Sequence, residues 1–258
     1  MKEKYKEAFE KTKIAGEIAA KALDEVAKII KPGIQTDTID KLCYEYIKDC
    51  GAYSAPLFYR GFPKSCCTST NHIVCHGIPS DKILREGDIV NVDVTASKDG
   101  WHGDTSRTFE IGEVSVKAKK LVKTTFEAMM KAIEIVKDDI HLGDIGSVIQ
   151  KHVEAEGFSV VQDFCGHGIG KKFHEEPNIL HYGKKGTGDK IKAGMIFTIE
   201  PMINFGKHET KTLNDGWTAV TKDKSLSAQF EHTIGCLLYT SDAADEGLGV
   251  DLGGRRII

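Results

Sequence analysis

Apolar residues recur at helical spacing in two regions of the chain, and each region consists of a long stripe followed by a shorter one. In the first region the pattern predicts a long amphipathic helix that runs to Ile30 and is stopped by Pro32-Gly33. A shorter helix follows, with Thr36 or Thr38 as its cap, and ends at Gly51. Both helices are expected to bury one face.

The second region repeats this plan. A long apolar stripe covers residues 118–136, Leu142-Gly143 interrupts it, and a short stripe covers residues 145–153. Each pair of helices leads into strand-rich segments, which predicts two related αβ halves, at residues 1–112 and 113–235. The two halves resemble each other in pattern and not in residue identity, so coincidence among common elements stays open as an alternative.

The strand-rich part of the first half contains a hairpin. Residues 89–95 alternate between valines on one face and polar side chains on the other, and Asp99-Gly100 is a strong two-residue turn signal. With that turn, Asp93 lies opposite Ser106 and diagonal to Asp104. The pleat then places the two carboxylates on the same face.

Polar residues in unusual settings suggest a shared site. Asp93 and Asp104 alone are more simply explained as surface acids of a solvated hairpin. In the second half, however, His167 lies among three glycines, and Glu200 and Glu231 are embedded in apolar, strand-like segments. Acids in such segments usually have partners. Five such placements favour a metal, which would compensate the repulsion between carboxylates.

Composition narrows the class of protein. The 258 residues are 40% hydrophobic and 28% charged, with a formal net charge of -3, which is typical of a soluble globular protein and offers no basic excess for nucleic acid. The seven cysteines form no CxxC pair, which favours a reducing cytosol over a disulfide framework or a zinc finger. No apolar stretch predicts a signal peptide or a membrane span.

Seven segments in order then carry a specific resemblance. They are Asn71–Pro79, Asn91–Thr95, His102–Thr105, Cys165–Gly170, Phe173–Pro177, Phe197–Pro201 and Gln229–Thr233. These segments resemble the motifs of methionine aminopeptidases, from the first helix to about Gly235. The resemblance implies a single catalytic domain over residues 1–235 with the α+β pita-bread fold, in which two pseudo-symmetric αβ halves enclose a curved antiparallel sheet. It also implies metal-dependent removal of the initiator methionine when the second residue is small.

The resemblance implies five ligands for two divalent metal ions. Asp104 and Glu231 would bridge both ions, Asp93 would chelate one, and His167 with Glu200 would hold the other. Four carboxylates and one imidazole suit Mn(II), Fe(II), Co(II) or Zn(II), and their charge balances two divalent ions. Two such ions share a water and lower its pKa toward ~7. Glu200 is then expected to serve as the general base as well as a ligand.

The resemblance also assigns residues beyond the ligands. His174 would stabilise the oxyanion, and His76 would hydrogen-bond the scissile amide, whereas His232 should point to the other face of its strand. A monovalent cation is linked to Asn71, Ile73 and Ser227. The methionine pocket is expected to have soft, aromatic walls. Its residues would be Tyr59, Phe62, Cys67, Phe173 and Trp217, besides His76 and His174, with Pro56 where relatives often carry Cys.

Spacing indicates the subtype. From His167 to Glu200 there are 33 positions (200 − 167), which leaves no room for the helical insertion of type II enzymes and favours the short, bacterial type I form. The family resemblance stops at Gly235, and residues 236–258 resemble a translated sequencing adapter, so we expect a non-native tail. Without the strand that follows in relatives, the end of the sheet should be poorly packed.

Two other functions stay open. A prolidase-like dipeptidase would use the same fold, and a non-catalytic relative that binds partners would have lost its metals. For the favoured function we expect a cytoplasmic monomer that acts on N-terminal methionine peptides and on nascent chains at the ribosome, with no nucleic acid or membrane as partner.

Overall fold

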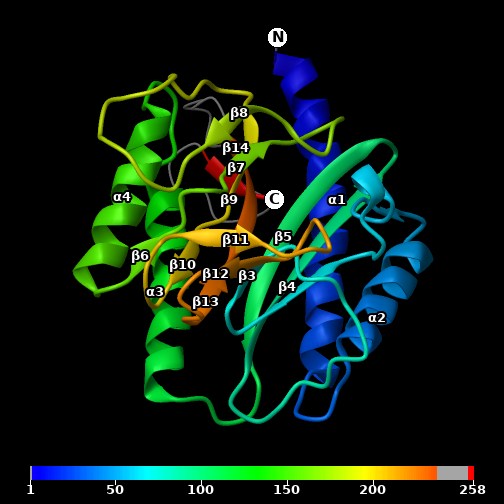
Figure 1. Cartoon of the computed structure of the whole chain (residues 1–258). Coiled ribbons are helices and arrows are strands. Elements are labelled where there is room, and N and C mark those ends of the chain that lie inside the picture. Colours follow the sequence, from blue (N-terminus) through cyan, green and yellow to red (C-terminus); the bar gives the residue numbers. More distant parts are fainter. Residues whose placement is uncertain (1, 237–254) are drawn as a thin grey trace.

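A computed structural model describes residues 2–236 and 255–258 of the chain, and in Figure 1 one pair of helices lies to the right and a second pair to the left of the central strands. The first pair is α1 (Lys2–Ile29) and α2 (Thr36–Asp49). The second pair is α3 (Val116–Glu134) and α4 (Leu142–Ala155). The predicted arrangement of two αβ halves is therefore confirmed.

The helix boundaries follow the local sequence signals with two exceptions. The break between α3 and α4 falls at residues 135–141, and Leu142-Gly143, predicted to interrupt the helical pattern, instead begin α4. α1 ends before Pro32-Gly33, and Gly33 adopts a positive φ of 95°. Ser115 caps α3, because its side chain accepts a hydrogen bond from the N–H of Ala118. The predicted threonine cap of α2 is wrong. Gln35 occupies the cap position, and the Thr36 hydroxyl lies inside the helix and donates to the carbonyl of Ser80 at 3.0 Å.

The central sheet is antiparallel throughout and spans both halves. Its main path runs β1-β4-β5-β14-β9-β7-β8, while β2 pairs with β4 and β15 pairs with β14. The strands are β1 (Tyr53–Ser54), β2 (Cys67–Thr70), β4 (Ile89–Lys98), β5 (Trp101–Glu110), β7 (Gly166–Gly168), β8 (Glu175–Ile179), β9 (Ile196–Ile199), β14 (Glu231–Cys236) and β15 (Arg255–Ile257). The β5–β14 pair joins the first half to the second.

Two smaller sheets and a short helix lie beside the central sheet. One sheet has the order β13-β10-β6 and the other β11-β12-β3. Their strands are β3 (Ile73–Cys75), β6 (Ser159–Val160), β10 (Met202–Asn204), β11 (Thr210–Thr212), β12 (Ala219–Thr221) and β13 (Ser227–Gln229). A 3-10 helix, η1, covers Tyr59–Gly61. Among the helices of the described residues, none is long and apolar enough to cross a bilayer.

Each half has its own hydrophobic core between its helices and the sheet. The first core contains Leu23 and Ile39 together with Val92, one of the alternating valines of β4. The second core contains Leu121 of α3 and Phe197 of β9. Since the helices cover this face of the sheet, the polar residues of the same strands point to the opposite face.

The end of the chain differs from the expectation. Arg255–Ile257 form β15, which pairs with β14 through Ile234↔Ile257, and Ile258 is buried. The predicted loss of a returning strand is therefore wrong: a short strand does pair with the outer part of β14. The adapter-like segment falls largely on residues 237–254, which lie outside the described residues. That residues 236–258 are foreign to the native protein stays our proposal.

The contact of α1 with β5 is tight enough to test. A Cβ on Gly103 would lie 2.2 Å from the backbone N of Gly16, and the backbone of a packed helix cannot yield as a flexible side chain does. Gly103→Ala should lower the free energy of unfolding by ~1–3 kcal/mol, as overpacking typically does. Chemical denaturation measures the change. Gly170→Ala is the control, because its Cβ would first meet a flexible Glu175 carboxylate at 3.3 Å; equal effects of both changes would contradict the packing argument.

Candidate metal centre and active-site pocket

Three carboxylates come from adjacent strands across the junction of the two halves. In the ladder, Asp93 of β4 lies opposite Ser106 of β5, and Ser106 lies opposite Glu231 of β14. Asp104 lies two residues from Ser106 and opposite Thr95. Because side chains alternate along a strand, all three acids point to the face away from the helices. The hairpin turn falls at residues 99–100, between the paired Lys98 and Trp101, as the sequence predicts.

Side chains reinforce this junction, where the backbone ladder is short. β5 and β14 share two registered pairs, Glu231↔Ser106 and His232↔Thr105. The Thr233 hydroxyl donates to the carbonyl of Asp104 at 2.8 Å and accepts from its N–H at 3.0 Å. The Thr105 hydroxyl donates to the Glu231 carbonyl at 2.8 Å. The backbones that carry Asp104 and Glu231 are thus held together by threonine hydroxyls.

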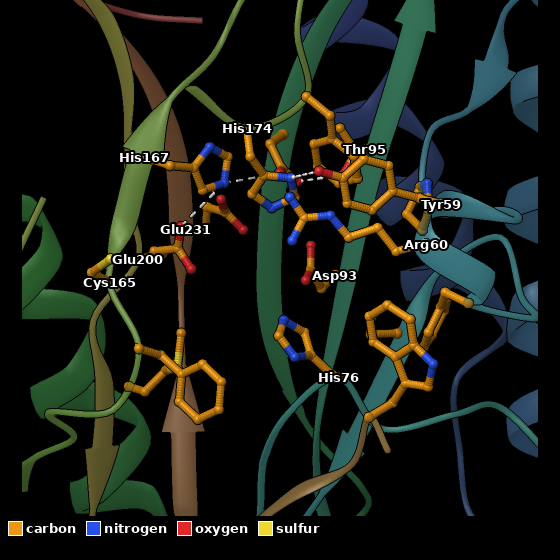
Figure 2. Close-up of a pocket in the computed structure, with 18 of the residues that line it drawn as sticks. Tyr59, Arg60, His76, Asp93, Thr95, Cys165, His167, His174, Glu200 and Glu231 are labelled. Atoms are coloured by element: carbon orange, nitrogen blue, oxygen red, sulfur yellow. Dashed lines mark hydrogen bonds and ion pairs between the residues drawn. The ribbon is translucent and has the colours of Figure 1, made fainter. Parts of the chain in front are cut away.

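The second half brings an imidazole and a fourth carboxylate to the same place. His167 lies on β7, and Glu200 directly follows β9. The Nε2 atom of His167 lies 3.6 Å from Oε1 of Glu200 and 3.9 Å from Oδ2 of Asp104. Asp104, His167 and Glu231 each offer a ligand atom, and these atoms lie within 4.8 Å of one another. Figure 2 shows that His167, Glu200 and Glu231 approach from one side of the pocket and Asp93 from the other.

Burial strongly disfavours charge on these acids when no cation is present. Burial raises the pKa of Asp93 to about 7 and that of Glu200 to about 8. The pKa values of Asp104 and Glu231 lie well above their ordinary values, first because of burial and then because of repulsion from the neighbouring acids. Among the described residues no Lys or Arg forms an ion pair with any of the four. Buried carboxylates without a cationic partner, beside an imidazole, fit a divalent metal site.

Hydrogen bonds orient the ligand candidates, and alternation could have revealed several of the donors. Thr95 donates to Oδ1 of Asp104 at 2.8 Å, and Thr198 donates to Oε1 of Glu200 at 2.7 Å. The Gln229 amide lies 3.4 Å from Oε2 of Glu200. Each donor stands two positions from an acid in the sequence, so each shares that acid's face.

His181 does not lie two positions from any of the ligand candidates in the sequence, and sequence reasoning missed it. It is fully buried, and its Nε2 accepts a hydrogen bond from the N–H of Glu200 at 3.1 Å. Burial lowers the pKa of His181 to about 3, so its imidazole is neutral at neutral pH. The acceptor role of Nε2 then places its proton on Nδ1.

The two histidines expected to assist the reaction lie on the wall of the same cavity, which has a volume of about 340 Å³. The Nδ1 atom of His174 lies 3.1 Å from the hydroxyl of Tyr59, and burial lowers the pKa of His174 to about 3. His76 adopts a positive φ of 56°, a conformation that is uncommon among residues other than glycine and that often marks functional positions. His232 is not part of the wall; its Nδ1 lies 3.3 Å from the Thr105 hydroxyl.

Aromatic side chains form the apolar part of the cavity. Phe62 and Trp217 meet edge to face with ring centroids 5.2 Å apart, and Tyr59 lies 4.9 Å from Phe173. Burial keeps the pKa of the Cys67 thiol well above its ordinary value, so this wall is uncharged. All five residues of the expected methionine pocket therefore line this cavity, as does Pro56. Sequence reasoning missed further lining residues, namely Arg60, Asp163, Phe164, Cys165 and Met202.

The residues linked to a monovalent cation lie elsewhere. The N–H of Ser227 donates to the carbonyl of Asn71 at 2.8 Å, which brings the two positions together. The Asn71 side chain is engaged with Asp88 at 2.8 Å and with the N–H of Ile89 at 3.1 Å. Ile73 pairs with Val220 on β12.

Comparisons with known proteins decide the family. Residues 10–236 match the model of metallopeptidase family M24. The chain is 54% identical over 228 residues to a methionine aminopeptidase of Rickettsia prowazekii, with 88% of each chain covered. It is 52% identical over 244 residues to that of Escherichia coli, with 92% of each covered.

The chain belongs to metallopeptidase family M24.

Solved structures agree with this membership. The crystal structure of methionine aminopeptidase from R. prowazekii matches with a TM-score of 0.90 and 50% identity, and covers 98% of this chain and 96% of that one. A prolidase from Pyrococcus furiosus, at 24% identity and a TM-score of 0.71, shares the fold, although the match covers only 61% of its length. The central sheet with its two flanking halves is thus the pita-bread fold of this family.

The buried acids predict how stability depends on pH when metal is removed. Asp93 and Glu200 rise from ordinary pKa values of 3.8 and 4.5 to about 7 and about 8, so the folded chain holds protons that the unfolded chain releases. Their contribution to stability is present at low pH and is lost as the pH rises. In EDTA, the melting temperature should therefore fall between about pH 6.5 and pH 8. Below this range the neutral histidines His174 and His181, whose pKa values are lowered from 6.5 to about 3, add an opposite contribution that rises with pH.

Thermal unfolding across this range, with and without Mn(II), measures the effect. Added Mn(II) should restore most stability at the upper end of the range, because it binds the ionised acids. Glu200→Gln, which removes one titrating group, should show a shallower fall in EDTA. A melting temperature that rises over the same range in EDTA would contradict the assignment.

Proposed function

We propose that the chain is a metal-dependent methionine aminopeptidase that removes the initiator methionine when the second residue is small. One observation carries the proposal: four carboxylates, three of them buried, and one imidazole, drawn from both halves, line one cavity together with apolar and aromatic side chains. The first set suits divalent cations and the second suits a thioether side chain. The high identity to methionine aminopeptidases supports the same function.

Two divalent cations fit the charge and the arrangement of the ligand candidates. Asp104 and Glu231 lie on the two strands that meet at the junction of the halves, so they are the candidates to contact both ions. Asp93 comes from the first half, while His167 and Glu200 come from the second. We propose that each half thereby supplies the remaining ligands of one ion. When bound, such a pair supplies Lewis-acid activation of water and of the scissile carbonyl.

The residues around these ligands handle the protons. We propose that Glu200 receives the proton of the attacking water, since Thr198 and Gln229 leave its carboxylate fixed but not neutralised. A hydrogen bond from the Tyr59 hydroxyl to Nδ1 of His174 would leave the proton of the neutral imidazole on Nε2. His174 could then donate to the oxyanion from Nε2. His76, on the opposite side of Asp93 in Figure 2, would bind the scissile amide.

Substrate selection follows from the apolar wall. Phe62, Trp217 and Cys67 present aromatic rings and a neutral thiol, which contact a methionine thioether favourably. We propose peptides and nascent chains with an N-terminal methionine as substrates, at the ribosome in the cytoplasm, and a monomeric enzyme. A monovalent cation near Asn71, Ile73 and Ser227 belongs to the same proposal, supported by the proximity of Asn71 and Ser227.

Removal of the Glu200 carboxylate tests the catalytic assignment. Glu200→Ala should reduce metal-dependent release of methionine from Met-Gly-Met-Met by at least ~10²-fold, because it removes both a ligand and the proton acceptor. Chromatography of the free methionine, with Mn(II) or Co(II) added, measures the rate. Equal rates in the two proteins would remove the assignment. A wild-type chain that cleaves only Xaa-Pro peptides would instead support the prolidase-like alternative.

The role of His174 predicts a separate kinetic signature. His174→Ala should lower kcat by ~10²–10³-fold, the typical effect of losing one oxyanion donor, with little change in KM. Bound metal, measured by elemental analysis, should stay at the wild-type level because His174 is not among the proposed ligands. Tyr59→Phe is the matched change that removes only the hydroxyl partner of His174, and its effect should be smaller. A His174→Ala protein with unchanged kcat would refute the role.

A further inference from the structure

A second cavity adjoins the active-site pocket and shares three of its residues. It is lined by His102, Lys171 and Lys172, among others, and by Tyr59, Phe173 and His174, which also line the first cavity. Its volume is about 370 Å³. We name it the Lys171–Lys172 groove. Because Tyr59, Phe173 and His174 belong to both cavities, a chain that leaves the active site past these residues enters the groove.

The position of the methionine pocket sets the direction of a bound peptide. His76 lies on one side of Asp93, whereas Tyr59 and His174 lie on the other (Figure 2). The ring centroid of Trp217 lies 6.3 Å from that of His76 and 5.2 Å from that of Phe62, so these aromatic side chains belong to the His76 side. Tyr59 and Phe173, which also belong to the expected methionine pocket, form its border with the groove. A peptide whose first side chain contacts Phe62 and Trp217 therefore directs its following residues past this border. An extended chain advances ~3.3–3.6 Å per residue, so residues beyond the second reach the groove.

The segment that carries Lys171 and Lys172 is anchored to the β4–β5 hairpin by hydrogen bonds and ring contacts. The carbonyl of Gly170 accepts a hydrogen bond from the N–H of His102 at 2.8 Å and lies 2.9 Å from its Nδ1. The His102 ring is parallel to that of Phe173 within 3°, with centroids 5.9 Å apart. The ammonium of Lys171 lies 5.3 Å from the centroid of the Trp101 ring. Because these contacts already fix the side chains of the groove, little conformational entropy of the protein is lost when a peptide binds there.

The groove is also positively charged without compensation. Within the described part of the chain, neither Lys171 nor Lys172 forms an ion pair with a carboxylate. Arg60 adds a third cation at the shared wall, where its guanidinium lies 5.3 Å from the centroid of the Tyr59 ring. The acids of the metal centre lie deeper and are proposed to be neutralised by their own cations. The groove that adjoins the active site thus has two lysines and no carboxylate among its described lining residues.

We propose that the Lys171–Lys172 groove is an extended substrate subsite that receives the third and fourth residues of the peptide and favours acidic side chains there. This inference rests on the proposed function and deepens it. The attraction acts between partly exposed charges, so it is modest and weakens as salt screens it. It should appear as faster capture of acidic peptides, in kcat/KM, more than as a change in kcat.

Three amidated peptides that differ only at the third and fourth positions test the preference. They are Met-Ala-Glu-Glu-Ser, Met-Ala-Gln-Gln-Ser and Met-Ala-Lys-Lys-Ser, and the amide end removes a carboxylate that could bind the groove by itself. For the wild-type chain with Mn(II) at low ionic strength, kcat/KM should be ~5-fold or more higher for the Glu-Glu peptide than for the Lys-Lys peptide. At ~0.5 M salt this ratio should fall toward one.

Two double variants test whether the preference for acidic peptides comes from Lys171 and Lys172. The double change Lys171→Gln and Lys172→Gln should bring the ratio of the two charged peptides to below ~2 while leaving cleavage of the Gln-Gln peptide within ~2-fold. The matched control is Lys184→Gln with Lys185→Gln, a second pair of adjacent exposed lysines that lines neither cavity. It makes the same change in net charge and should keep the wild-type ratio.

The possible outcomes distinguish a failure of the proposed acidic preference from a failure of the proposed aminopeptidase function. Cleavage of all three wild-type peptides at equal rates would overturn the acidic preference and leave the aminopeptidase function intact. A preference that persists in the Lys171→Gln, Lys172→Gln variant would also overturn it, since the charge would then act from elsewhere. No cleavage of any peptide by the wild-type protein would overturn both. The salt dependence of the wild-type ratio provides the test if the double variant does not fold.

Discussion

Four carboxylates, three buried and Asp93 partly buried, lie close together at the junction of the two halves, and among the described residues no lysine or arginine pairs with them. Their mutual repulsion and loss of hydration oppose folding unless the acids stay protonated or a cation enters. The raised pKa of each acid expresses this cost. The chain therefore folds around a site that is incomplete without positive charge, as membership in a metallopeptidase family requires.

The rest of the structure keeps the acids in place despite this repulsion. Each half has its own hydrophobic core, so neither half depends on the metal centre for its packing. Between the halves, β5 and β14 share a short ladder, and the hydroxyls of Thr105 and Thr233 add bonds at the positions that carry Glu231 and Asp104. Apolar burial thus supplies stability away from the site, and directional hydrogen bonds set the geometry at it.

Charge also changes sign along the route that a substrate would take. The acids, neutral histidines, aromatic rings and Arg60 line the cavity, and Lys171 and Lys172 line the groove that adjoins it. Burial lowers the pKa of His174 and His181 to about 3, so these imidazoles act as neutral donors or acceptors rather than as cations. Lys171 and Lys172 lie outside the cavity that holds the ligand candidates, whereas Arg60 lines it, and none of the three forms an ion pair with the four acids.

Local patterns in the sequence determined the helices, the β4–β5 hairpin and the facing of Asp93 and Asp104, because helical and strand periodicity depend on neighbouring residues alone. Motifs identified the family and five ligand candidates. Only the tertiary structure placed His181 behind Glu200, brought Lys171 and Lys172 beside the active site, put Gln35 rather than a threonine at the cap of α2, and paired β15 with β14. These contacts join residues far apart in the chain or depend on what occupies the neighbouring space, and no local pattern encodes such distances.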